Sequence, residues 1–456
     1  MPNPDYNVVV IGAGFTGITA ARELQRSGLD TLLIEARDRI GGRTHTIDFH
    51  GHPLEMGGMN VHWIEPYIWS ELNRYGIPIR ENDPFDTFIL VDGETHRRYA
   101  PAEAGRRFRT IFERFFEPFD RSIMPRPHDP LFRREMVAEV DRLSLRDRFD
   151  AVELSPEDRK WLGGWLSFHA GGPIEHGAMA SLLRTYALAN WNYETMLDIM
   201  GRYRIVGGSA RLLSLMLDDA ACDIRLSLPV AAIADDHAGV TVTARDGKRF
   251  TASAAVVAVP VNTWPQIAFS PALAAPRAEA AQAGFMAPNV TKIWVLVRHG
   301  GNERVMVQWP EGSPISVLRS DAQIGGDLLM VALSTDPEFD VQDRGGVERI
   351  IRSVLPSAEV IDMATTAWGN EEFTRGAIPC MRPGQLSRYY ERLREPDGRL
   401  FFAVSDLGSG FTGIDGAIEQ GHTAARHVRA FLSQKSGLNS NPIGVGCRSG
   451  RVRQPL

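Results

Sequence analysis

Residues 7–35 read NVVVIGAGFTGITAARELQRSGLDTLLIE: an apolar run, a glycine-rich turn, a helical stretch and a second apolar run that ends in an acid. This order predicts a strand, a tight turn, a helix and a second strand. The glycines allow a pyrophosphate to approach the backbone at the helix N-terminus, and Glu35, eighteen residues after Gly17, can accept a hydrogen bond from a ribose hydroxyl. A glycine turn in an ordinary βα unit is the alternative. The predicted dinucleotide contacts are Gly12, Ala13, Gly14, Phe15, Thr16, Gly17 and Glu35.

The residues after Glu35 favour flavin adenine dinucleotide (FAD) over NAD. Residues 36–44, ARDRIGGRT, form a basic loop with two glycines, and residues 54–58, LEMGG, supply another glycine pair. NAD leaves the first βαβ unit in another direction and does not need this loop. FAD binds in an extended form, so backbone N–H groups and one guanidinium of this loop could contact its pyrophosphate and ribityl chain. The further expected contacts are Ala36, Arg37, Gly42, Arg43, Met56, Gly57, Gly58 and Met59.

Residues 35–44 together with residues 55–61 resemble the flavin-containing monoamine oxidase family. The resemblance implies an α/β fold of two domains, a Rossmann-like, glutathione-reductase-type FAD-binding domain and an inserted α+β substrate domain. The FAD-binding domain is expected to be discontinuous, over residues 5–79, 204–281 and 372–432, and the substrate-binding domain to span residues 80–203 and 282–371. Residues 433–456, rich in Gly, Ser and Arg, are expected to be a flexible tail.

Length and composition agree with a globular protein of two domains. The chain has 456 residues, of which 43% are hydrophobic and 23% charged, and a formal net charge of −6 at pH 7. This length exceeds what one hydrophobic core usually holds, and the acidic balance argues against nucleic acid as a partner. Three widely spaced cysteines predict no disulfide framework. Because the nucleotide motif begins at residue 7 and no run of eighteen apolar residues occurs, we expect a cytoplasmic protein without a membrane segment.

Lys292 is the residue expected to act in catalysis. The chain has fifty basic side chains but only four lysines, and the other three, Lys160, Lys248 and Lys435, lie in charged stretches or in the tail. Lys292 lies in an apolar strand predicted over residues 289–297, where burial disfavours an unpaired ammonium and lowers its pKa. The resemblance implies that Lys292 holds a water at the flavin N5 and promotes the reaction with oxygen. The alternative is that Lys292 lies at the end of the strand and extends its aliphatic stem so that the ammonium reaches solvent.

The resemblance also assigns cofactor contacts late in the chain. Val230 ends a strand predicted over residues 224–230, and its backbone is expected at the adenine. Asp406 ends a strand predicted over residues 400–406 and is expected beside the ribityl and pyrophosphate groups. Ile414 lies at the start of the last helix, whose N-terminus would face the flavin pyrimidine ring and stabilise negative charge there.

The expected substrate pocket departs from that of the mammalian members. Two tyrosines frame the amine in those enzymes; here the first position matches Ile378, and the second falls near Gly413 or Ile414, where the chain is one residue short. The candidates for the pocket wall are Asn60, Trp368, Ile378 and Phe411. With its altered aromatic cage, the chain resembles the bacterial nicotine and pseudooxynicotine oxidases of the family, which accept bulky N-heterocyclic amines.

Four histidines close together in the sequence do not predict a metal site. His45, His50, His52 and His62 fall on a predicted hairpin, without a carboxylate or thiol at ligand spacing. We therefore expect no metal.

The predicted function is oxidation of a small-molecule amine with FAD. A neutral amine would lose a hydride from its α-carbon to the flavin N5, water would hydrolyse the imine or iminium, and oxygen or an electron-carrier protein would reoxidise the cofactor. An L-amino-acid oxidase and an FAD-dependent desaturase are the alternative enzymes. A flavoprotein that only carries electrons is the non-enzyme alternative, and the helical insertion and Lys292 argue against it. The oligomeric state stays open, with a homodimer as one expectation.

We predict that FAD is bound without a covalent link. In the mammalian members a cysteine bonds to the flavin, and the matching residue here is Ala377, with Cys380 three residues further on. The purified protein should be yellow, and acid or heat precipitation should release intact FAD into the supernatant. Flavin that stays with the precipitated protein would contradict this expectation.

Overall fold

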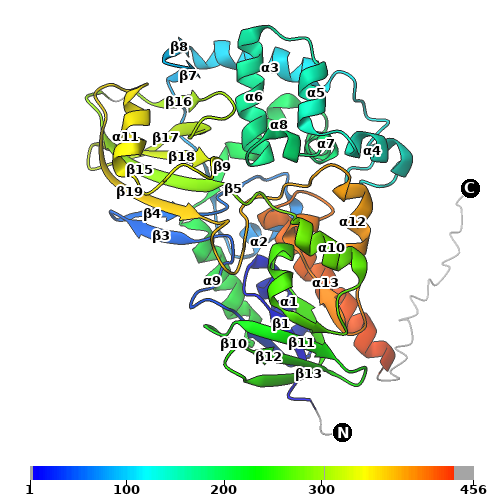
Figure 1. Ribbon diagram of the computed structural model, residues 1–456. Helices are drawn as coiled ribbons and strands as arrows, with labels where there is room; N and C mark the ends of the chain where they lie inside the picture. The colour runs from blue at the N-terminus through cyan, green and yellow to red at the C-terminus, as the bar shows by residue number, and fades with distance from the viewer. Residues whose placement is uncertain (1–3, 302, 436–456) are drawn as a thin grey trace, which may run out of the picture.

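The computed structural model describes residues 4–301 and 303–435 and has two halves (Figure 1). The half drawn at the bottom contains the first strand β1 (Tyr6–Ile11), helix α1 (Phe15–Gln25) and the last long helix α13 (Ile414–Lys435). The half drawn at the top contains a second sheet on one side and a cluster of helices on the other. The chain crosses between the two halves several times, so the functional site can draw on segments far apart in the sequence.

A large sheet of eight strands organises the lower half, in the order β10-β2-β1-β13-β12-β11-β14, with β20 also paired to β13. Strands β10, β2, β1, β13 and β20 run parallel, and β11, β12 and β13 form an antiparallel meander. Parallel strands covered on both faces read as continuous apolar runs, as β1 and β2 do. The further bounds are β2 (Thr31–Ile34), β10 (Asp223–Arg225), β11 (Val230–Asp235), β12 (Val240–Ala244), β13 (Arg249–Val257), β14 (Ala268–Ser270) and β20 (Leu400–Phe402).

Helix α1 lies between α9 (Gly208–Ala220) and α13 and is covered by both. The close packing of α13 on α1 requires glycine at residue 421 of α13, because a side chain there would meet the carbonyl oxygen of Thr16 at 2.6 Å. Helix α2 (Pro66–Arg74) packs on α13 in turn. The glycine turn and the helix that follows it are therefore held inside the lower half.

The upper half combines a seven-stranded sheet, in the order β19-β15-β18-β17-β16-β7-β8, with helices that pack beside it (Figure 1). Its strands are β7 (Thr87–Asp92), β8 (Thr95–Tyr99), β15 (Thr291–Arg298), β16 (Val305–Gln308), β17 (Val317–Ile324), β18 (Asp327–Ser334) and β19 (Glu359–Ala367). Two small ribbons, β3 (Thr46–Phe49) with β4 (His52–Glu55), and β5 (Asn60–Val61) with β9 (Tyr203–Ile205) and β6 (Ile79–Glu81), complete the strands.

The helices of the upper half pack around aromatic side chains, with Trp161 stacked on Phe88 at a centroid distance of 4.6 Å. Ser155 caps the helix that follows it by accepting a hydrogen bond from the Asp158 backbone N–H. The further α-helices of the chain are α3 (Pro101–Phe116), α4 (Arg134–Asp141), α5 (Leu145–Ala151), α6 (Pro156–Ala170), α7 (Met179–Leu188), α8 (Tyr193–Gly201), α10 (Ala275–Ala283), α11 (Arg344–Arg352) and α12 (Gln385–Arg394). Short 3-10 turns are η1 (Ile174–His176), η2 (Val261–Gln266) and η3 (Ser405–Leu407).

The predicted α/β fold class is confirmed, with three local corrections. Residues 224–230 do not form one strand, because Ser227 has a φ of 55° and the chain turns between β10 and β11. Residues 400–406 do not form one strand either, since β20 ends at Phe402 and Asp406 lies in η3. Helix α13 extends through residues 433–435 of the predicted tail, and residues 436–456 lie outside the described part of the chain. The domain boundaries stay a prediction.

We expect the buried ion pair between α1 and α2 to stabilise the lower half. Arg22 and Glu71, 0% and 1% exposed, form two N–H···O bonds of 2.6 Å. Burial opposes ionisation of Glu71, but hydrogen bonds from Arg22 and His422 outweigh it and lower the pKa of Glu71 to about 2. Arg22→Met should reduce the free energy of unfolding by about 3–5 kcal/mol, because it leaves a buried carboxylate without its partner. Chemical denaturation at neutral pH measures this.

Arg134→Met is the matched control, because Arg134 and its partner Glu391 are both about half exposed. This substitution should reduce the free energy of unfolding by less than about 1 kcal/mol. The Glu71 pKa is lowered, so its contribution is present above the ordinary value of 4.5 and is lost as pH falls toward 2. Equal effects of the two substitutions at neutral pH would show that the α1–α2 pair does not hold the fold.

Candidate functional site

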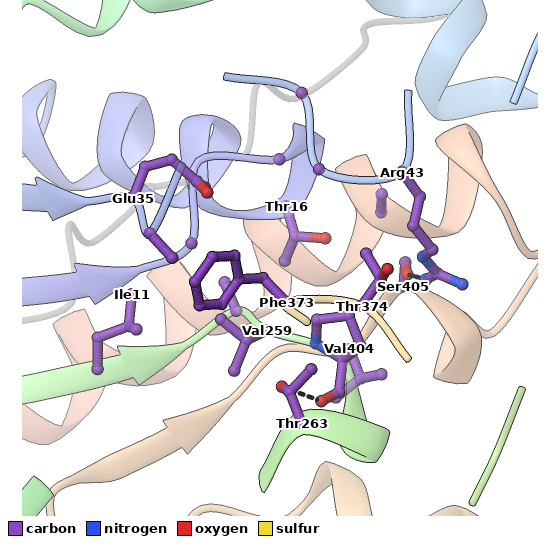
Figure 2. Close-up of a pocket in the computed structure, with 18 of the residues that line it drawn as sticks. Ile11, Thr16, Glu35, Arg43, Val259, Thr263, Phe373, Thr374, Val404 and Ser405 are labelled. Atoms are coloured by element: carbon purple, nitrogen blue, oxygen red, sulfur yellow. Dashed lines mark hydrogen bonds between the residues drawn. The ribbon is translucent and has the colours of Figure 1, made fainter. Parts of the chain in front are cut away.

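A long cavity lies where strands β1, β2, β13 and β20 of the large sheet end (Figure 2). In parallel sheets of this kind, ligands bind outside the carboxyl ends of the strands. The cavity is lined by residues of nine segments, within 11–16, 34–37, 41–44, 228–230, 258–267, 373–374, 377–379, 403–405 and 413–417, and by Gly58 and Arg245.

The glycine turn forms one wall of the cavity. Gly12 has a φ of 103°, and a side chain at Gly17 would come within 1.7 Å of the Gly12 carbonyl oxygen. Helix α1 can therefore lie directly against the turn only when residue 17 is glycine. No side chain caps its first turn, so the N–H groups of Phe15 and Thr16, which both line the cavity, face it as donors for an anion.

Glu35 fixes the turn to the second strand. Its carboxylate accepts hydrogen bonds from the backbone N–H of Ala13 at 2.8 Å and of Arg37 at 2.9 Å, and the side chain is 4% exposed. The remaining lone pairs of these oxygens are free to accept from a ribose hydroxyl, since a carboxylate accepts about four hydrogen bonds. Leu228, Pro229 and Val230 line the same end of the cavity.

Arg43 joins the first glycine-rich loops to the end of the chain. Its guanidinium donates to Ser405 Oγ at 2.5 Å, to Asp406 Oδ1 at 2.7 Å and to the Ala377 carbonyl at 3.1 Å. Figure 2 shows the Arg43 guanidinium and Ser405 side by side at one end of the cavity. Asp406 is 1% exposed, and its second oxygen has no hydrogen-bond partner among the described residues. A ligand hydroxyl is the natural partner for such an oxygen.

Lys292 is buried at the start of β15 rather than extended into solvent. Its Nζ donates to the carbonyls of Glu55 at 3.1 Å and Gly57 at 2.5 Å, and lies 3.3 Å from Met59 Sδ. Burial, and after it the nearby Arg204 guanidinium, lower the pKa of Lys292 to about 7. The lysine does not line the cavity, but it holds the strand end that presents Gly58 to it.

The structure separates the predicted cofactor contacts into two groups. Most of the predicted cofactor contacts line the cavity: Gly12, Gly14, Phe15, Thr16, Glu35, Ala36, Arg37, Gly42, Arg43, Gly58, Val230 and Ile414. A second group lies directly behind this wall: Ala13, Gly17, Met56, Gly57, Met59 and Asp406.

The four residues predicted for a substrate pocket do not share a cavity among the described residues. Ile378 lines the long cavity. Asn60 donates instead to the Met200 carbonyl at 2.7 Å, Trp368 donates to the Met56 carbonyl at 3.0 Å, and Phe411 is 7% exposed. The lining of a substrate pocket thus stays a prediction.

Sequence reasoning missed several lining residues. Val259 and Pro260 follow β13, the direct neighbour of β1, so the end of that apolar strand was a usable signal. Phe373, Arg245 and Ser405 also line the cavity but belong to loops whose place depends on the tertiary fold. Ser405 directly precedes the predicted contact Asp406, whereas nothing in the local sequence of Arg245 indicates a ligand.

Comparison with known proteins gives one consistent result. A family profile described as flavin containing amine oxidoreductase matches residues 15–429. Pseudooxynicotine dehydrogenase from a Pseudomonas species is 36% identical, across 96% of this chain and 88% of that protein. Nicotine dehydrogenase from Pseudomonas putida is 34% identical, across 94% and 89%. A putrescine oxidase triple mutant with redesigned cofactor binding shares the fold, with a TM-score of 0.79 at 22% identity over 93% of this chain and 99% of that one.

We expect Glu35→Ala to weaken FAD binding by about ten- to a hundredfold, the effect of losing a hydrogen bond to a charged group worth about 1.5–3 kcal/mol. Quenching of flavin fluorescence by the protein freed of cofactor measures the Kd. Asp38→Ala, an exposed carboxylate of the same loop that does not line the cavity, should leave the Kd unchanged. An unchanged Kd for Glu35→Ala would remove this residue from the dinucleotide site.

Proposed function

The chain belongs to the family of flavin-containing amine oxidoreductases, and from this premise we propose that it oxidises a bulky cyclic or N-heterocyclic amine with FAD held in the long cavity. Two findings together support the proposal. The chain is 36% identical to pseudooxynicotine dehydrogenase over 96% of its length, and the glycine turn, Glu35 and Arg43 line the cavity. FAD is the cofactor of this family, and it supplies the redox step by accepting a hydride from the amine.

The described residues fit an extended dinucleotide. Glu35 and Val230 would hold the adenosine half, and the N-terminus of α1 would take the pyrophosphate. Arg43 and the unpaired oxygen of Asp406 offer a donor and an acceptor for the polar linker of the cofactor. The far end, between Gly58, Ile378 and Ile414, would receive the flavin, with the N-terminus of α13 directed at it.

The proposal of non-covalent binding rests on two side chains. Residue 377 is alanine, and its carbonyl accepts a hydrogen bond from Arg43. Cys380 is the nearest thiol in the sequence, but it is 9% exposed and donates to the Ala170 carbonyl at 3.1 Å. Burial raises the pKa of Cys380 to about 11, which disfavours the thiolate needed for a covalent bond.

Lys292 is proposed to tune the reoxidation step. A buried ammonium that titrates near neutral pH provides positive charge and a hydrogen-bond donor where negative charge develops. Its two bonds to carbonyls of residues 55 and 57 also keep the wall around Gly58 in place. Neither role requires a side-chain base for removal of the hydride.

Three further features stay proposals. The relatives named dehydrogenases favour an electron-carrier protein as acceptor, with oxygen as the alternative. A homodimer remains an expectation of the sequence. A cytoplasmic location is supported by the free thiols of Cys222 and Cys380, both within the described part of the chain. No described helix is long and apolar enough to cross a membrane.

An anaerobic reduction screen tests the function. The purified yellow protein is mixed without oxygen with nicotine-like cyclic amines, primary and secondary amines, putrescine and L-amino acids, and loss of the flavin absorbance is followed. We expect fastest bleaching by the cyclic N-heterocyclic amines. Fastest bleaching by L-amino acids would establish the amino-acid oxidase alternative, and no bleaching by any amine would contradict the proposal.

We expect Lys292→Met to slow reoxidation by about 10²-fold, the effect of losing one preorganised donor, and to slow reduction by the amine less. Methionine fills a similar apolar volume, so FAD should stay bound. Because the pKa of Lys292 is lowered to about 7, the ammonium is present below that pH, and the wild-type reoxidation rate should fall as pH rises through 7. Stopped-flow absorbance separates the two half-reactions.

Lys160→Met is the matched control, because Lys160 pairs with the half-exposed Asp92 on the surface. It should change neither half-reaction. If Lys292→Met reoxidises at the wild-type rate with oxygen and also with a one-electron acceptor, then the role of Lys292 in reoxidation is refuted.

A further inference from the structure

The adenosine end of the cavity is covered by a loop from late in the chain. Figure 2 shows the Phe373 ring facing into the cavity between Glu35 and Val259. Phe373 is about 340 residues from Glu35 in the sequence, and it reaches this position in the connection that follows β19. We call residues 371–375 the covering loop.

Two arginines that line the cavity lie over the Phe373 ring. The guanidinium carbons of Arg37 and Arg245 are both 5.5 Å from the ring centroid. Arg37 follows the second strand of the sheet, and Arg245 lies in the turn between β12 and β13. The aromatic ring is thus held by charges from two separate loops of the lower half, at a distance typical of cation–π contacts.

The same arginines also hold the acids that precede the ring. Arg37 donates to Glu371 at 2.9 Å, and Arg245 donates to Glu372 at 2.6 Å. The carboxylates are 42% and 50% exposed, so each ion pair contributes little and is screened by salt. At its other side the loop is anchored firmly, because Thr374 Oγ1 donates to the Trp368 carbonyl at 2.9 Å inside the protein.

This combination is suited to opening and closing. A buried anchor at Thr374 keeps the loop attached, while weak exposed ion pairs hold its outer part. The contact between Arg43 and Asp406 elsewhere in the cavity wall is better shielded from solvent, since the Asp406 side chain is 1% exposed. The outer part of the cover over the adenosine end is therefore held only by weak contacts.

We propose that the covering loop is a strap over the adenosine half of FAD, with Phe373 as a cofactor-positioning residue, and that its opening sets the rate at which FAD leaves. The inference rests on the proposed placement of the adenosine at Glu35 and Val230. It adds to that placement a route for cofactor exchange, in which Phe373 swings out together with Glu371 and Glu372 and FAD leaves.

Dissociation of FAD tests the strap without any measurement of turnover. The protein loaded with FAD is diluted into an excess of an FAD-binding apoprotein, and transfer of the flavin is followed by fluorescence. Phe373→Ala should speed dissociation by about ten- to a hundredfold, the range for removing one aromatic side chain from a ligand contact. Phe373→Tyr should keep the wild-type rate within about twofold, since the ring is retained.

Phe132→Ala is the matched control. Phe132 is 44% exposed and has Arg126 over its ring at 3.9 Å, so it loses the same kind of contact at a site outside the cavity. It should leave dissociation unchanged. Equal dissociation rates for Phe373→Ala and Phe132→Ala would overturn the proposal. If Phe373→Ala fails to fold, Phe373→Leu replaces it in this test, because leucine keeps the bulk of the side chain but removes the aromatic ring.

Salt and half-cofactor probes separate the strap from the placement itself. Dissociation of FAD from the wild type should become faster with added salt, and Glu372→Gln should reduce that dependence. If salt has no effect on the wild type, the outer ion pairs do not hold the loop.

ADP should bind Phe373→Ala less tightly than wild type, whereas FMN should bind both equally. If Glu35→Ala weakens ADP binding and Phe373→Ala does not, the placement stands and the strap is wrong. If neither does, the placement itself has failed.

Discussion

The site depends on one steric constraint, the absence of a side chain where α1 meets the turn before it. A Cβ at residue 17 would lie 1.7 Å from the Gly12 carbonyl oxygen, so glycine alone lets the helix begin against the end of β1. The N-terminus of α1 then opens into the cavity, and Glu35 locks the arrangement by accepting from the Ala13 N–H. Helices α9 and α13 pack on α1, and the contact with α13 depends on a second glycine, Gly421. The anion site and the acceptor for a hydroxyl thus share one origin in the glycine turn.

A second constraint joins the two ends of the chain. Arg43 holds Ala377, Ser405 and Asp406 with one guanidinium, and Arg37 reaches Glu371 nearby. These contacts link segments more than 330 residues apart, so the cavity is complete only after the closing segment has docked. Strand β20 provides the docking, since it pairs with the second half of β13 and delivers residues 403–405 to the end of the sheet. The site therefore draws on segments from both ends of the chain.

The sequence revealed what is encoded locally and missed what is encoded by assembly. The glycine turn and Glu35 could be predicted because strand, turn, helix and acid lie within thirty contiguous residues, and each step has its own physical reason. Lys292 could be singled out because lysine is rare in this chain, and its burial is confirmed, although its role remains a proposal. The break at Ser227 was missed because apolar composition continues through it. Phe373 and Arg245 were missed because only the fold brings their loops to the cavity. The residues proposed for the substrate pocket, taken from resemblance, were not found around one cavity for the same reason.

The central claim is that a single FAD spans the cavity from the glycine turn to the closing segment. Hydrogen exchange of the backbone amides, measured on the protein freed of cofactor and again after FAD is added, tests it most directly. Exchange should slow together in residues 12–16, 41–44, 403–405 and 413–417, and stay unchanged in β16 and β17 of the upper sheet. Slowing confined to residues 12–37, with none in the closing segment, would contradict the account, because the bound nucleotide would then occupy only the first strand–turn–helix unit.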